Sequence, residues 1–269
     1  MLGNPFGRGY EWFDMRESGQ RFSGIARLYG EEGLERLRSA HVGVVGIGGV
    51  GSWAAEALAR TGIGALTLVD LDDVCVTNIN RQLHALDETV GRPKVEVMAR
   101  RVHGINPECR VTASAEFFTA RTAAEILAPG FAWVVDAIDA VSNKSLLIAA
   151  CRERGIPIVS CGAAGGRRDA TFVRLADLAD VTHDRLLAAV RTRLRREGII
   201  PAAGKRSGVP CVFSPEAAVP PSPASDPETA ETSAKLNCDF GYGSAAFVTG
   251  TFGFAAAGWV VRQIALNRG

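Results

Sequence analysis

The stretch HVGVVGIGGVGSWAAEALARTGIGALTLVD, residues 41–70, decides the fold class. A short β-branched run precedes three glycines at G-x-G-x-x-G spacing, and a helical pattern and a second apolar run follow them. Glycines at such a turn let the backbone approach a phosphate, which faces the free N–H groups of the next helix. We therefore predict a strand, a nucleotide-binding loop, a helix and a second strand.

Gly46, Gly48 and Gly51 supply the glycine spacing, Gly49 lies between them, and Asp70 ends the second strand. A carboxylate at that position can accept hydrogen bonds from both hydroxyls of a ribose. The loop alone does not separate NAD from ATP, because both carry a ribose and phosphates. The alternative, in which the glycines serve only helix packing and Asp70 is a cap, does not account for the full order of elements.

The chain from 41 to 160 alternates short strand patterns with longer helical ones, which predicts a doubly wound α/β fold with a mainly parallel, Rossmann-like sheet. Further strands are expected at 109–115, 132–139 and 156–160, with a covering helix at 93–105. Beyond Gly162 we expect a strand at 171–175 and a basic amphipathic helix at 183–198. We divide the chain into an N-terminal arm, 1–20, a nucleotide-binding region, 21–162, and a C-terminal region of the same domain, 163–269, with an irregular loop at 214–235.

Composition excludes several classes of protein. Thirty basic and 29 acidic side chains give a net charge of +1, so the overall charge does not indicate a nucleic-acid partner. The six cysteines form no C-x-x-C pair, which argues against a zinc ribbon or a disulfide scaffold. We therefore expect the protein to lie in the reducing cytoplasm. The N-terminus carries charges and glycines where a secretory signal needs an apolar run.

The uncharged segment 245–261 nearly reaches the length of a membrane span. Its small residues Thr249, Gly253 and Ala257 recur every four positions, which favours close helix packing. We expect a buried helix here, at a subunit interface, rather than a span or a membrane-associated segment.

The residues after the glycine loop favour ATP over NAD. VTNINRQ, GRPK and DAIDAVSNK supply Asn78, Arg81, Lys94 and Asp139 at successive ends of the expected sheet. A carboxylate that attacks a triphosphate is an anion approaching an anion, so cations must neutralise the charge and a carboxylate must hold magnesium. Each residue has a plain alternative: Lys94 as a surface lysine, Arg81 paired with Asp72 or Asp73, and Asp139 as a helix cap.

These motifs, together with VGRPKVE, INPE and VVDAID, resemble the ThiF/MoeB/HesA superfamily of ubiquitin-activating-enzyme-like adenylyltransferases from about residue 21 to 166. The resemblance implies that the glycine loop holds ATP, that Asp70 binds ribose, and that Asp139 meets Mg²⁺. It further implies that Asn78, Arg81 and Lys94 contact the phosphates. Where relatives have a second N-terminal arginine this chain has Gly24, and Arg21 and Arg27 are the candidates to replace it.

Four further segments resemble a tRNA-modifying branch of that superfamily: RFSGIARLYGEEGLERL, DLDDVCVTNINRQLHAL, CVFSPEA and NCDFGYGSAAFVTGTFGF. That branch uses ATP to activate the threonine carboxylate of threonylcarbamoyladenosine beside the anticodon of tRNA, and the side chain then cyclises with loss of water. The resemblance implies a homodimer, a monovalent cation (Na⁺ or K⁺) and a cysteine desulfurase or sulfur-acceptor system as a partner.

Basic residues between 185 and 206 offer the best surface for tRNA phosphates. The candidates are Arg191, Arg193, Arg195, Arg196, Lys205 and Arg206, with Arg185 beside them. The alternative is an ordinary solvated helix face. Cys238, in a glycine-rich turn before the final helix, is the candidate reactive thiol, with structural packing as its alternative. Cys151 and Cys161 are expected to be buried.

Three other functions remain open from the sequence. Activation of a ubiquitin-like sulfur carrier is disfavoured by the missing paired C-x-x-C zinc ligands of its superfamily members. An NAD-dependent oxidoreductase needs a substrate domain, and the region after Gly162 is small for one. The third is a non-catalytic tRNA-binding or scaffold protein.

Overall fold

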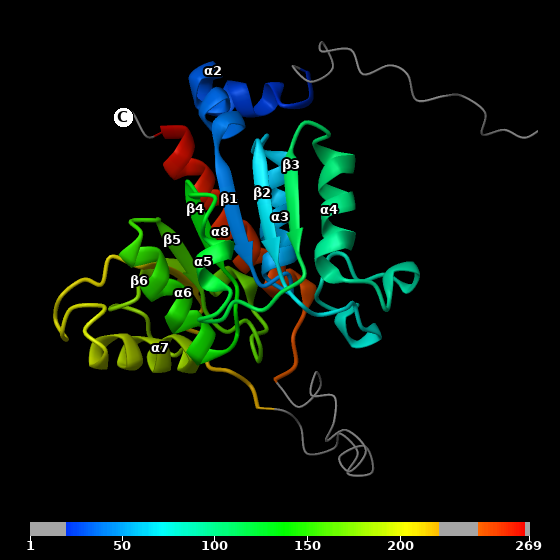
Figure 1. Cartoon of the computed structure of the whole chain (residues 1–269). Helices are drawn as coiled ribbons and strands as arrows, with labels where there is room; N and C mark the ends of the chain where they lie inside the picture. Colours follow the sequence, from blue (N-terminus) through cyan, green and yellow to red (C-terminus); the bar gives the residue numbers. More distant parts are fainter. Residues whose placement is uncertain (1–19, 221–241, 267–269) are drawn as a thin grey trace, which may run out of the picture.

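The structure is a computed structural model that describes residues 20–220 and 242–266. One seven-stranded sheet forms its centre, in the order β3-β2-β1-β4-β5-β7-β6 (Figure 1). The strands are β1 (His41–Val45), β2 (Ala65–Val69), β3 (Arg110–Ser114), β4 (Trp133–Asp136), β5 (Ile158–Cys161), β6 (Arg174–Asp177) and β7 (Pro210–Phe213). All pairs are parallel except β6 with β7. The predicted α/β fold is confirmed.

Helices cover both faces of the sheet and enclose two hydrophobic clusters. The α-helices are α2 (Ser23–Ser39), α3 (Gly51–Arg60), α4 (Lys94–Ile105), α5 (Ala123–Ile126), α6 (Val141–Glu153), α7 (Arg185–Arg196) and α8 (Ala246–Leu266). Short 3-10 turns lie at Val76–Asn78, Asp87–Thr89 and Ala170–Phe172. Residues of α3, α4 and α8 contribute to one cluster, and residues of α5, α6 and α7 contribute to the other. Every residue of β2 is buried, as a strand covered on both faces requires.

The strand order reverses between β1 and β4, and this reversal fixes where a ligand can bind. In parallel α/β sheets ligands bind outside the carboxyl ends of the strands at such a switch point. Val45 pairs with Val69 on one side and with Asp136 on the other. The glycine loop, Asp70 and the 136–139 segment therefore start side by side at one edge of the sheet.

Two expectations about the C-terminal region need correction. The strand expected at 171–175 begins at Arg174, because the Asp169 carboxylate accepts a hydrogen bond from Thr171 N (2.8 Å) and closes a 3-10 turn first. Strand β7 was not predicted, although it lies between β5 and β6. It has four residues and starts at a proline, so it carries little local signal.

Helix α8 packs along α3 of the same chain, and this contact accounts for its small residues. A Cβ on Gly253 would lie 2.5 Å from the carbonyl oxygen of Val50, and Thr249 Oγ1 donates to the carbonyl of Arg81 (3.0 Å). Trp53 packs edge-on against Phe254 at 5.7 Å between ring centroids, as helix packing. Within residues 20–220 and 242–266, no helix combines the length and the apolarity needed to cross a membrane.

Candidate functional site

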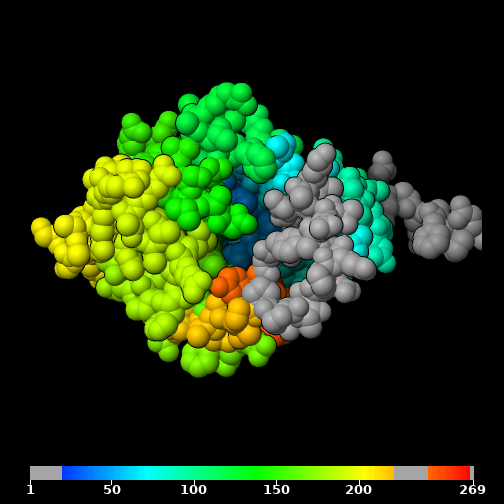
Figure 2. All heavy atoms as spheres, turned by 90° about the horizontal axis from the view of Figure 1, so that it is seen from below, coloured from blue at the N-terminus to red at the C-terminus, as the bar shows by residue number. Residues whose placement is uncertain are grey.

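A cavity of about 740 Å³ opens at the carboxyl ends of β1, β2, β4 and β5. Figure 2 looks onto this face and shows it hollowed, with the blue part of the chain visible at the floor. Its volume falls in the range of small-molecule sites. The cavity brings together Gly46, Gly48, Gly49, Asp70, Asn78, Arg81, Lys94 and Asp139.

The glycines of the loop have two different tasks. Gly46 has φ +90°, and a Cβ there would lie 2.8 Å from the carbonyl oxygen of Ala137. A Cβ on Gly51 would lie only 1.7 Å from the carbonyl oxygen of Gly46, so both residues allow the tight turn itself. A Cβ on Gly48 would meet nothing closer than 3.8 Å. Gly48 therefore leaves open space beside the cavity, where a phosphate can approach the start of α3.

Asp70 ties the glycine loop to the end of β2. Its Oδ2 accepts a hydrogen bond from Ile47 N (2.6 Å) and its Oδ1 accepts one from Asp72 N (2.9 Å). Burial raises the pKa of Asp70, although nearby Lys94 opposes the shift. Since each carboxylate oxygen has more than one acceptor position, the group can still accept from a ribose.

Lys94 is not the surface lysine that its position at the start of α4 would allow. Only 5% of it is exposed, and its ammonium pairs with the Asp72 carboxylate at 2.8 Å. Arg81 pairs with neither Asp72 nor Asp73 in the described part of the chain; its guanidinium donates to the carbonyl of Thr77 (2.7 Å). Both cations line the cavity. Lys94 is paired with Asp72, whereas Arg81 makes no ion pair with the described residues.

Asp139 is exposed at the cavity wall and does not cap α6, which has no side-chain cap at its N-terminus. The segment that carries it is fixed by Asp136, whose Oδ1 accepts from Ile138 N (3.1 Å). Oδ2 of Asp136 meets the ammonium of Lys144 at 2.8 Å and the hydroxyl of Ser160 at 2.7 Å. All three side chains are buried, and the sequence reasoning missed this network. The only sequence signal was the D-x-x-D spacing, whose first acid is Asp136.

His84 was also missed, although it lies only three residues after Arg81 of the N-x-x-R segment. It is 1% exposed, and its Nε2 lies 2.7 Å from the carbonyl oxygen of Ile47 in the glycine loop. Because a carbonyl only accepts, Nε2 carries the proton. Burial lowers the pKa of His84 to about 4, so the ring is neutral at pH 7. Its hydrogen bond to Ile47 holds the backbone of the glycine loop.

The described cysteines near the cavity are poor nucleophiles. Burial raises the pKa of Cys151 and of Cys161 to about 12, as expected for packing residues. Burial likewise raises the pKa of the Cys211 thiol. Cys238 lies outside the described residues.

The basic segment expected to bind tRNA is only partly exposed. Arg191 donates to the carbonyls of Leu178 (3.0 Å) and Val181 (2.8 Å), which ties α7 to the body of the protein. Arg193 pairs with Glu197 at 2.8 Å, and Arg195 is half-buried. The exposed members are Arg196, Lys205 and Arg206, together with Arg185 at the start of α7. Local contacts therefore occupy Arg191 and Arg193, which a count of arginines does not reveal.

The N-terminal arginines lie away from the cavity of their own chain. Arg21 donates to the carbonyl of Ile105 (2.8 Å) at the far end of α4, and neither Arg21 nor Arg27 lines the cavity. The described residues also contain no group of three or more His, Cys, Asp or Glu side chains arranged to hold a metal ion.

Comparison with known proteins gives consistent matches. Residues 22–265 match the ThiF family. The chain is 51% identical over 252 residues to the tRNA threonylcarbamoyladenosine dehydratase of Escherichia coli K12, covering 91% of this chain and 93% of that one. A solved structure of the E. coli dehydratase in complex with ATP superposes with a TM-score of 0.82 at 48% identity, covering 93% of this chain and 97% of that one. The molybdopterin-synthase adenylyltransferase of Salmonella typhimurium is 40% identical over 140 residues, covering 52% of this chain and 55% of that one.

Proposed function

This chain belongs to the ThiF family, and from that premise we propose that it is an ATP-dependent enzyme that dehydrates N6-threonylcarbamoyladenosine in tRNA. The single observation that carries the proposal is the cavity at the β1/β4 switch point, which gathers the carboxylate of Asp70, the cations Arg81 and Lys94, and the exposed carboxylate of Asp139. The similarity to the E. coli dehydratase extends over more than nine-tenths of both chains, which supports the same reaction.

The reaction has two steps. An oxygen of the threonine carboxylate attacks the α-phosphorus of ATP, the bond to the β-phosphate oxygen breaks, and pyrophosphate leaves. An atom of the carbamoyl group then attacks the activated acyl carbon, AMP leaves, and the ring closes. The side chain has lost the atoms of one water, and the energy comes from the conversion of ATP into AMP and pyrophosphate.

The residues of the cavity fit ATP by their chemistry. Gly48 and Gly49 leave backbone N–H groups open to phosphate oxygens, and Asp70 accepts from the ribose. Asn78, Arg81 and Lys94 offset the charge of the triphosphate and of the incoming carboxylate. Lys94 is held in place by Asp72, so little conformational freedom is lost when a phosphate binds.

Mg²⁺ would be held by Asp139 together with phosphate oxygens of ATP. That division of ligands is usual for Mg²⁺, which binds one or two carboxylates plus substrate phosphates and waters. When bound, the ion supplies charge neutralisation on the triphosphate. The buried Asp136 fixes the backbone of Ile138, which keeps Asp139 at the cavity wall.

The proposal extends to features that rest on the family resemblance. We propose a cytoplasmic homodimer, with Arg21 or Arg27 taking the place of the second N-terminal arginine. The resemblance also favours a monovalent cation site, an interaction with a cysteine desulfurase or sulfur-acceptor system, and tRNA contacts by the 191–206 segment. Cys238 has no necessary role in this reaction, because an intramolecular ring closure needs no protein nucleophile.

One experiment tests the function. The protein is incubated with ATP, Mg²⁺ and tRNA that carries threonylcarbamoyladenosine, and the nucleosides are analysed by mass spectrometry. We expect loss of one water from the modified nucleoside, with stoichiometric AMP and pyrophosphate, and at least a hundredfold lower rate for Asp139→Asn. Pyrophosphate release that requires a small protein ending in Gly-Gly instead of tRNA would overturn the proposal in favour of a sulfur-carrier activator.

A further inference from the structure

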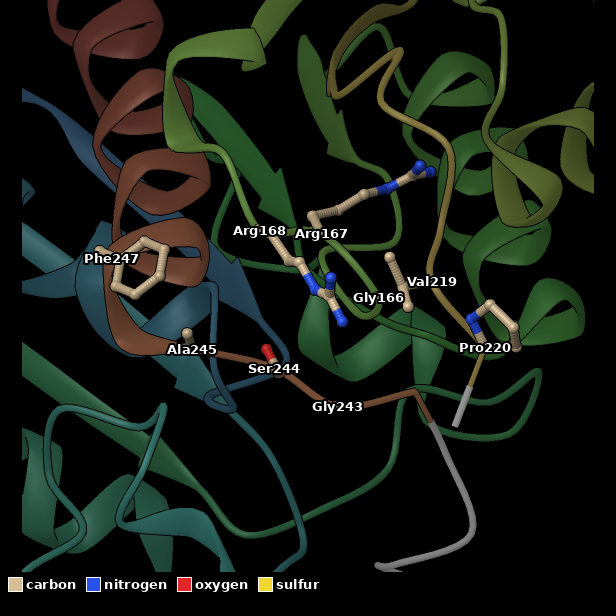
Figure 3. A pocket seen from close by; sticks show the side chains of 9 residues that line it. All are labelled: Gly166, Arg167, Arg168, Val219, Pro220, Gly243, Ser244, Ala245 and Phe247. Atoms are coloured by element: carbon tan, nitrogen blue, oxygen red, sulfur yellow. The ribbon is translucent and has the colours of Figure 1, made fainter. Parts of the chain in front are cut away.

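A second cavity of about 310 Å³ adjoins the nucleotide cavity. Its walls are the 166–168 loop, residues 219–220 and the 243–247 segment that leads into α8 (Figure 3). Ser244 lines both cavities, so the two are neighbours. None of the residues proposed to take part in adenylation lines this second cavity.

Arg168 presents an unneutralised guanidinium to this cavity. The residue is exposed, and its side chain has no hydrogen bond or ion pair with the described part of the chain. Figure 3 shows the guanidinium directed toward Ser244, whereas the neighbouring Arg167 points the other way. Arg167 is buried and donates to the carbonyl of His183 (2.7 Å), so the two adjacent arginines differ in role.

The loop that carries Arg168 is held by its backbone. The Glu216 carboxylate accepts from Arg168 N (3.0 Å) and Asp169 N (3.1 Å). Gly166 N donates to the carbonyl of Gly243 (2.7 Å), and its carbonyl accepts from Val219 N (2.9 Å). The Glu216 carboxylate is therefore bound by backbone N–H groups and not by the Arg168 guanidinium, which faces the cavity.

Phe247 supplies an aromatic face on the opposite side of the cavity. It lies in the first turn of α8 and is 61% exposed. An exposed phenyl ring together with a free guanidinium is the combination with which proteins bind unpaired RNA, because bases stack on the ring and phosphates pair with the cation.

We propose that Arg168 and Phe247 form a binding subsite for an unpaired tRNA nucleotide next to the modified adenosine. This inference rests on the proposed function, because the threonine carboxylate must reach the α-phosphorus in the adjoining cavity. The neighbouring nucleotides of the anticodon loop then have to cross its rim, where Ser244 joins the two cavities. The phosphate pairs with Arg168 and the base stacks on Phe247. Arg185, the first residue of α7, donates to the hydroxyl of Tyr242 (3.4 Å), which lines the nucleotide cavity.

The test measures the affinity of the full-length protein for threonylcarbamoyl-modified tRNA and, separately, for ATP. We expect Phe247→Ala to weaken tRNA binding at least about fivefold, and Phe247→Trp to retain it because a larger ring still stacks. Arg168→Gln should weaken binding and reduce the slope of log Kd against log salt by about 0.7, the value for one phosphate contact to a single strand. Arg100→Gln, which removes an exposed charge from α4, is the matched control and should leave tRNA affinity unchanged.

Different failures are distinguishable. If the wild-type protein releases no pyrophosphate with modified tRNA, the proposed function fails. If the wild-type protein is active but the Arg168 and Phe247 variants bind tRNA with unchanged affinity, the subsite is wrong. Equal losses in Phe247→Ala and Phe247→Trp would refute base stacking, and a tenfold loss of ATP affinity in Arg168→Gln would assign that arginine to the nucleotide cavity instead. Unchanged ATP affinity also reports that the variants are folded.

Discussion

Replacement of Lys144 by methionine should destabilise the protein strongly, because it leaves the buried Asp136 carboxylate without its ion-pair partner. Both side chains are completely buried, and their charged atoms are 2.8 Å apart. Breaking a buried pair by removing one partner costs roughly 3–5 kcal/mol. Asp136 keeps its hydrogen bonds from Ser160 and from the backbone of Ile138, so we expect a loss near the lower limit, about 3 kcal/mol.

The loss is measured by urea unfolding followed by tryptophan fluorescence, for which the chain has four tryptophans. For a domain of this size about 3 kcal/mol corresponds to a fall in Tm of roughly 6–12 °C. Glu197→Gln is the matched control, since it breaks an exposed pair with Arg193 at the same 2.8 Å distance. That variant should lose less than about 0.5 kcal/mol.

A double variant separates the buried charge from the lost packing. Combining Lys144→Met with Asp136→Asn removes both charges, and the pair should be less destabilised than the sum of the single changes. The reasoning is refuted if Lys144→Met loses less than about 1 kcal/mol, or if the double variant shows strict additivity.

Two further outcomes follow from the glycine loop and its support. Gly51→Ala should abolish ATP binding, because its Cβ would overlap the carbonyl oxygen of Gly46 at 1.7 Å. Gly104→Ala lies on the open face of α4 and should instead stabilise the protein by about 0.5–1 kcal/mol. ATP titration and urea unfolding of each variant check these two outcomes. The low pKa of His84, about 4, means that the unfolded chain takes up a proton below pH 6.5 before the folded one does. Stability is therefore complete above pH 6.5 and falls as the pH drops toward 4, so between pH 7 and 4.5 the wild-type protein should lose about 2–3 kcal/mol more than His84→Gln. Equal pH dependence of the two proteins would contradict the assignment.

The sequence by itself determined the parallel strands around the glycine loop and the chemistry of their carboxyl edge. The pattern from 41 to 70 predicts two parallel strands and a phosphate-binding turn, because these depend on local spacing and on the absence of side chains at Gly46 and Gly51. The acid at position 70 and the residues at 81, 94 and 139 follow strand ends, and the carboxyl ends of parallel strands meet at one edge. Local order was enough to place them together.

Tertiary structure decided which of these residues are held and which are free. Lys94 is buried by its pairing with Asp72, and Arg191 is used by backbone carbonyls from a loop before α7. The Asp136, Lys144 and Ser160 network joins β4, α6 and β5, and no sequence spacing reports it. Three more features depend on contacts between segments far apart in the chain: the packing of α8 on α3, the insertion of β7 between β5 and β6, and the cavity beside Arg168. Such contacts are set by the shape and charge of distant partners, which local periodicity does not encode.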